Sequence, residues 1–146
     1  MKKIITFALV FILCFSTLCS CQLFEKAAEA QGMVYDFVSA LENGDYEAAT
    51  TYLHPDSTAT ADSLEEMILS LEEQHEIDFS NGVTFVQQTS SYTNSSTGCD
   101  GEGTVQHDIG YTVEIDGKTF TLEAVVLENS EGLGILSFVI KMSVGF

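Results

Sequence analysis

The sequence has very few positive charges, a single proline and no tryptophan. Lysine and arginine together number five, against 22 aspartates and glutamates. Arginine is absent, and only Lys26, Lys118 and Lys141 lie beyond residue 20, so residues 21–146 carry a formal charge of −19. A surface this acidic repels nucleic-acid phosphates and anionic lipid headgroups. We therefore exclude nucleic acid as a partner, while cationic partners stay open.

The chain also lacks an apolar N-terminal run long enough to span a membrane comfortably. The uncharged stretch over residues 4–18 has 15 residues, whereas a spanning helix needs about 20. Lys2 and Lys3 precede this stretch. A positive start, a short apolar run and a small residue before a cleavage point are typical of a secretory signal. We therefore expect residues 1–20 to be a signal peptide.

This segment ends in Leu18-Cys19-Ser20-Cys21, which resembles the lipobox of bacterial lipoproteins. The resemblance implies cleavage before Cys21 and a diacylglyceryl thioether on its sulfur. Two or three acyl chains would then anchor the protein stably, because one chain binds only marginally. The resemblance also implies a location at the bacterial cell membrane, facing outside the cytoplasm. The alternative is an ordinary signal peptide cleaved elsewhere, with Cys21 an unmodified thiol.

Cysteine is too scarce for a disulfide framework. Of the four cysteines, Cys14 and Cys19 lie in the predicted signal and Cys21 is the predicted lipid site. Cys99 is then left without an intramolecular partner, and the hydrophobic core must stabilise the fold alone. Cys99 is either a reactive or intermolecular thiol or, as we favour, an ordinary loop thiol.

Three amphipathic helices are predicted before residue 82, after a segment (residues 21–31) that is either a membrane-proximal tether or a helix start. Asn43-Gly44 is a stop signal for the first helix. Asp45 is an N-cap for a short second helix that ends before Pro55, and Ser63 opens a capping box for the third. The expected buried faces are Val34, Phe37, Val38 and Leu41, then Tyr46, Ala49 and Leu53, and last Leu64, Met67, Ile68 and Leu71.

The rest of the chain is predicted to form a four-stranded antiparallel meander, with a Ser/Gly/Asn loop over residues 93–103. The four strands are expected over residues 83–92, 104–115, 118–128 and 133–144. Residues 104–115 alternate between two faces of the strand, and the odd-numbered residues are expected to form the buried face. The last strand is expected to bury Leu136, Phe138, Ile140 and Met142. These residues face the same side of the sheet as the buried residues of 118–128 only if the loop between the two strands has an odd number of residues.

Asp116-Gly117 is the sharpest structural signal, because such a pair favours a two-residue type I′ turn. The turn fixes the register of the flanking strands. The predicted inward pairs are Val113 with Phe120, Tyr111 with Leu122, Ile109 with Ala124, and His107 with Val126. On the outer face, Thr112 meets Thr121 and Glu114 meets Thr119.

The stretch from Val34 to Ala49, followed by Tyr52-Leu53-His54-Pro55, resembles the opening of the nuclear transport factor 2-like superfamily. This group is also called SnoaL-like or ketosteroid-isomerase-like, and it includes small bacterial lipoproteins of unknown function. The resemblance implies a cone fold, in which helices close a strongly bent sheet around an interior that often holds a pocket. Gly110 is the expected bend. We predict one α+β domain over residues 32–146, with N-terminal helices packed on a curved four-stranded antiparallel sheet.

Candidate site residues follow from which face they share. His107 and Tyr111 lie on the apolar face of one strand, and His75 lies eleven positions after Leu64, on the core side of its helix. These three could form an acid–base pocket. They could instead be packed core or rim residues, which we favour. The superfamily's isomerases and hydratases use Asp, His and Tyr in the cone, but no local motif maps them here, so no catalytic residue is assigned.

No metal or cofactor is predicted. Asp100, Glu102 and Asp108 could offer oxygen ligands, but the EF-hand spacing is missing and a solvated acidic loop is favoured. Catalytic motifs such as Gly-x-Ser-x-Gly and His-Glu-x-x-His are absent from the sequence. His54, just before Pro55, is expected at a helix end near a carbonyl or solvent.

Three functions stay open. The first is a non-catalytic, lipid-anchored module that binds a small molecule or an envelope protein. The second is an isomerase- or hydratase-like enzyme that uses the cone interior and needs an accessible His107. The third is an accessory subunit that forms a homodimer through its open sheet face.

Overall fold

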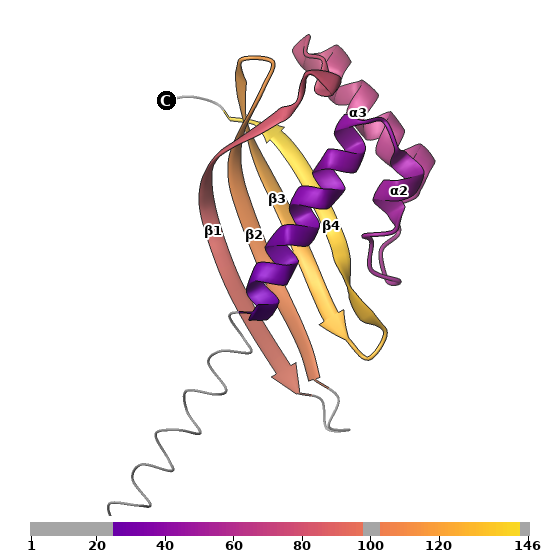
Figure 1. Ribbon diagram of the computed structural model, residues 1–146, viewed down its shortest axis with the longest axis vertical. Coiled ribbons are helices and arrows are strands. Elements are labelled where there is room, and N and C mark those ends of the chain that lie inside the picture. The colour runs from indigo at the N-terminus through magenta and orange to yellow at the C-terminus, as the bar shows by residue number, and fades with distance from the viewer. Residues whose placement is uncertain (1–24, 98–102, 144–146) are drawn as a thin grey trace, which may run out of the picture.

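The computed structural model describes residues 25–97 and 103–143, which form an α+β fold (Figure 1). Helices pack on one face of a curved, unclosed, four-stranded antiparallel sheet, as the sequence predicts. The predicted signal peptide, Cys21, Cys99, Asp100 and Glu102 lie outside the described residues. The elements are a helix whose described part covers residues 25–42, α2 (Tyr46–Thr50), α3 (Ala61–His75), the short 3-10 helix η1 (Phe79–Asn81), β1 (Val83–Thr97), β2 (Gly103–Ile115), β3 (Lys118–Asn129) and β4 (Gly132–Met142).

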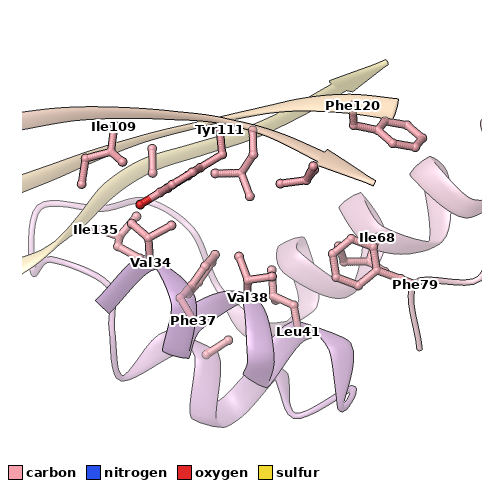
Figure 2. Packing of buried hydrophobic residues seen from close by; sticks show 14 of the residues in the cluster. Val34, Phe37, Val38, Leu41, Ile68, Phe79, Ile109, Tyr111, Phe120 and Ile135 are labelled. Atoms are coloured by element: carbon pink, nitrogen blue, oxygen red, sulfur yellow. The ribbon is translucent and has the colours of Figure 1, made fainter. Parts of the chain in front are cut away.

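The helix over residues 25–42, called the N-terminal helix below, supplies much of the core. Residues 25–31, where a tether and a helix start were both open, are helical. Val34, Phe37, Val38 and Leu41 are each at most 1% exposed, as predicted. Figure 2 shows them pointing at the sheet. The helix is followed by Gly44 in the left-handed region (φ 66°), and the Asp45 side chain caps α2 by accepting from the Ala48 N–H.

The capping box of α3 begins one turn earlier than predicted. Thr60, not Ser63, is the N-cap. The Ser63 N–H donates to Thr60 Oγ1 over 3.2 Å, and the Thr60 N–H donates to Ser63 Oγ over 2.8 Å. Ser63 thus takes the place that Glu or Gln holds in the usual box. This exchange satisfies two backbone donors and starts α3 at Ala61.

The β2–β3 hairpin confirms every pair predicted from Asp116-Gly117. Both turn residues have positive φ, 52° and 75°, as a type I′ turn requires. Val113 pairs with Phe120 and His107 with Val126, and the pairs between them follow in step. The odd-numbered residues of β2 therefore face the helices.

β1 is longer than predicted. It continues to Thr97, and Thr93 to Thr97 pair with His107 to Gly103 of β2. The predicted loop was wrong over residues 93–97, because a polar, flexible composition does not prevent pairing in a strand that is wet on both faces. The rest of the predicted loop falls mostly on residues 98–102, outside the described part of the chain.

β4 reaches its predicted alternation by a different route. The β3–β4 turn leaves two residues, 130 and 131, between the pair Asn129–Gly132, so the expected odd-numbered loop is wrong. A bulge then shifts the register, since Val126 pairs with Ile135 whereas Val125 pairs with Ser137. Ile135 is fully buried in place of the predicted Leu136, which is half-buried.

Beyond the bulge the even-numbered residues of β4 turn inward, but less completely than predicted. Phe138 and Ile140 are half-buried, and Met142 is 41% exposed. Phe138 still packs its ring edge on Phe37, with centroids 4.9 Å apart. The predicted burial of Met142 was therefore wrong.

The free side of β4 is covered at one point by the chain that follows α2. The His54 N–H donates to the Ile135 carbonyl over 3.0 Å, and the Ile135 N–H donates to the Tyr52 carbonyl over 2.8 Å. These bonds form a parallel bridge between Leu53 and Ile135. The contact passes directly over Gly134, which has no side chain to obstruct it.

Candidate functional site

His107 lies on the helix-covered face of β2 and is 2% exposed. Its Nδ1 lies 3.0 Å from the Thr93 hydroxyl of β1, within hydrogen-bond distance. Its Nε2 is buried without a hydrogen-bond partner. A neutral imidazole has one donor and one acceptor nitrogen, so the Thr93 contact satisfies one nitrogen and leaves the other unpaired.

The N-terminal helix brings a charge pair to this end of the sheet. Lys26 forms an ion pair with Glu128 of β3, which lies opposite Val105 in the register. One carboxylate oxygen of Glu128, Oε2, is also buried without a partner. Burial lowers the pKa of His107; Glu128 opposes this shift, and Lys26 adds to it. Burial therefore favours the neutral form of His107.

Tyr111 occupies the middle of the same face, in an aromatic cluster with Tyr35 of the N-terminal helix and Phe85 of β1. The Tyr111 ring lies 5.0 Å from that of Phe85 and 5.5 Å from that of Tyr35, between centroids. Its hydroxyl is buried and makes no direct hydrogen bond of normal geometry. Burial raises the pKa of Tyr111, and the nearby Tyr35 hydroxyl raises it further.

The structure places the three candidates on one face but does not bring them together. His107 and Tyr111 are four residues apart on β2, about 13 Å at the rise of a strand. His75, at the end of α3, packs its ring against Phe120, with centroids 5.4 Å apart. Phe120 pairs with Val113, about 20 Å along β2 from His107 at the same rise. An acid–base set of His107, Tyr111 and His75 is not assembled in this arrangement.

His54 is a buried polar residue that the sequence placed differently. The sequence predicts a helix end near a carbonyl or solvent, and the solvent alternative is wrong, because His54 is 2% exposed. The Asp56 N–H donates to its Nδ1 over 3.0 Å, so Nε2 carries the proton and donates to Asn129 Oδ1, also over 3.0 Å. Both ring nitrogens are satisfied, and His54 ties the chain after α2 to the β3–β4 turn.

Four of the surface hollows on the described part of the chain are lined by neither His107 nor Tyr111. One of these, about 440 Å³, is an open depression on the exposed side of α3, lined by Asp62, Glu65, Glu66, Leu69, Ser70 and Glu73. Another, about 340 Å³, lies between α3 and β4 and includes Phe37, Met67 and Phe138. Within residues 25–97 and 103–143, no three His, Cys, Asp or Glu side chains are grouped to hold a metal ion.

Two further findings bear on identity. No helix among the described residues is both long and apolar enough to cross a membrane. No family model, curated protein or solved structure matches the chain.

Because the pKa of His107 is lowered on folding, we expect it to make stability depend on pH. The unfolded chain takes up a proton near pH 6.5, whereas the folded chain takes it up only at lower pH. The stability that folding gains from keeping His107 neutral is thus fully present above pH 6.5, and it is lost as the pH falls toward the pKa of His107 in the folded protein. Asp108, Glu128 and Lys26 are the charged groups that act on the ring.

The check is urea unfolding of the wild type and His107→Gln between pH 8 and pH 5. We expect the urea midpoint of the wild type to fall relative to that of the variant as the pH drops. Because the acidic residues are shared by both proteins, their titration cancels in the comparison. A wild-type midpoint that rises relative to the variant on acidification would mean that His107 is stabilised in its charged form.

Proposed function

We propose that the protein is a lipid-anchored, extracytoplasmic binding module of the bacterial cell envelope, held by acyl chains on Cys21. The support is the lipobox-like ending of the signal segment and the strong acidity of the rest of the chain. Residues 22–31 contain no Ser/Gly/Pro-rich spacer after Cys21, and residues 25–31 are helical. The domain would therefore lie close to the membrane surface.

We also propose that the fold is the cone of the nuclear transport factor 2-like superfamily. The sheet is curved and unclosed, and the N-terminal helix lies across one of its faces, with α2 and α3 beside this helix (Figure 1). Core residues of both helices meet residues of β2 and β3 there (Figure 2). This one-sided covering is the arrangement that the resemblance implies.

Burial of His107 is the observation that favours binding over catalysis. A general base must come within hydrogen-bond reach of its substrate, directly or through one water. His107 is 2% exposed, and the Thr93 hydroxyl of β1 lies 3.0 Å from its Nδ1. His75 lies at the other end of the sheet, on Phe120. We therefore propose a non-catalytic role for these histidines.

Chemical modification tests this proposal. Diethyl pyrocarbonate acylates accessible imidazoles, and peptide mass analysis assigns the modified residue. In the native protein we expect His75, which is half-buried, to react, while His107 and His54 stay unmodified until the protein is unfolded in urea. Rapid native modification of His107, at the rate of His75, would contradict the non-catalytic proposal.

One observation favours a second candidate, an isomerase- or hydratase-like enzyme that uses the interior. Within the described residues, His107 Nε2, Tyr111 Oη and Glu128 Oε2 are buried and make no direct hydrogen bond of normal geometry, and all three belong to the helix-covered face of β2 and β3. Buried polar groups are usually satisfied, so these three could receive a polar ligand if the N-terminal helix moved. Protection of His107 from modification would argue against this candidate.

A further inference from the structure

No backbone of residues 25–97 or 103–143 bonds to the outer edge of the sheet at β1. β1 is the first strand in the order β1-β2-β3-β4, so only its β2 side is paired within the sheet. From Val86 to Ser96 every residue is exposed except Thr93, which is half-buried. The edge at β4 differs, because the chain after α2 bonds to Ile135 there. β1 therefore presents backbone N–H and C=O groups that can pair with another strand.

The stretch Ser90–Thr97 of β1 also lacks the usual devices that prevent such pairing. Edge strands are commonly protected by charged residues, proline or bulges. Val83–Thr97 contains no Asp, Glu, Lys, Arg or Pro, although the chain has 22 acidic residues elsewhere. Register shifts occur only between Phe85 and Gln87 and between Gln88 and Ser90. The eight residues from Ser90 to Thr97 are regular, an unprotected edge about 26 Å long.

Tyr92 and Asp108 give this edge a preference for positive charge. They are cross-strand partners on β1 and β2, so their side chains lie on the same side of the sheet. Tyr92 is 60% exposed. The Asp108 carboxylate accepts a hydrogen bond from Gln106 and stays half-buried. An aromatic ring beside a carboxylate suits a Lys or Arg side chain, through cation–π attraction and charge.

We propose that Ser90–Thr97 binds an extended, positively charged polypeptide segment, which adds to the sheet as a fifth strand beside β1. Main-chain hydrogen bonds would supply the affinity, and a Lys or Arg next to Tyr92 would supply the selectivity. The formal charge of −19 over residues 21–146 attracts such a segment and repels a second copy of this chain. This inference rests on the proposed binding function and names the class of partner.

The test uses the protein purified from bacterial membranes in detergent, titrated with acetyl-Thr-Lys-Thr-Arg-Thr-Lys-Thr-amide. Backbone amide NMR is expected to show shifts and slower hydrogen exchange within Ser90–Thr97. A peptide N-methylated at alternate residues keeps its charge but loses donors, and should bind at least tenfold more weakly. A peptide with glutamate in place of lysine and arginine should not bind.

Two variants locate the selectivity, and a third is their control. Tyr92→Leu keeps an apolar side chain but removes the aromatic face, and Asp108→Asn removes one charge. Each variant is expected to bind the cationic peptide several-fold more weakly than the wild type does. Glu123→Gln is the matched control, because Glu123 is an exposed acid of β3, paired with Lys141, and its loss should leave the affinity unchanged.

Other outcomes would overturn the proposal. Equal binding of the N-methylated peptide, or shifts confined to the acidic face of α3, would mean general electrostatic attraction. Slow exchange, without peptide, of the β1 amides that point away from β2, together with a dimer in sedimentation, would mean that a second copy occupies the edge. Anchoring is measured separately, since Cys21→Ser should leave peptide binding intact, so the two proposals can fail independently.

Discussion

Replacement of Cys21 by serine is expected to abolish fatty-acid labelling of the protein completely. The thiol of Cys21 is the predicted site of the diacylglyceryl group, and a serine hydroxyl cannot form the thioether. Cells grown with radiolabelled palmitate should therefore give a labelled wild-type band and an unlabelled variant band of equal abundance.

Cys19→Ser is the matched control for this experiment, since it removes a neighbouring thiol of the same segment. Its label should equal that of the wild type, and so should that of Cys99→Ser. Label that persists in Cys21→Ser, or that is lost in Cys19→Ser, would contradict the proposed lipid site. The outcome matters because a chain with three lysines beyond residue 20 cannot hold itself to an anionic membrane by charge.

Gly134→Ala is expected to destabilise the fold by about 3 kcal/mol, at the upper end of the cost of overpacking. A Cβ atom at this position would lie 2.5 Å from the His54 backbone nitrogen and 2.6 Å from its Cα. These atoms cannot rotate away, because Ile135 bonds to the backbone of Tyr52 and His54 on either side. Urea unfolding measures the loss as a lower midpoint.

Gly110→Ala is the control for Gly134→Ala. A Cβ at Gly110 would meet Ser90 Oγ at 2.5 Å and Thr89 Oγ1 at 2.8 Å. These atoms are ends of exposed side chains that can change rotamer, so we expect a loss below about 1 kcal/mol. Equal losses in the two variants would mean that the chain after α2 does not hold the β4 edge as described.

The sequence predicted the central hairpin in full because two local signals agreed. Asp116-Gly117 specified the turn, and the alternation in β2 specified which face is buried. The first helix was predictable for the same kind of reason, since Val34, Phe37, Val38 and Leu41 recur at helical spacing. In both elements one apolar face packs on the core. The sequence pattern therefore predicts the structure, because burial of apolar side chains determines both.

The remaining elements depend on contacts that a local pattern does not carry. The bulge before Ser137 changes the inward face of β4 in mid-strand, which no turn length reveals. Residues 93–97 pair with β2 although their composition is that of a loop. His54 is buried, and its Nε2 bonds to Asn129, which lies 75 positions away in the sequence.

The candidate site was predictable only in part. The shared face of His107 and Tyr111 followed from strand alternation, and the core side of His75 followed from helical spacing. The contacts of His107 with Thr93, and of Lys26 with Glu128, join elements that are distant in sequence. Periodicity shows that a residue faces the core, but not at which end of the core it lies.

The mass of the mature N-terminal peptide, isolated from the membrane fraction of a bacterial host, tests the proposed anchoring most directly. We predict a chain that starts at Cys21 and carries the added mass of a diacylglyceryl group on that residue, with or without an acyl chain on its amino group. A chain that starts at another residue, or an unmodified Cys21, would contradict the account.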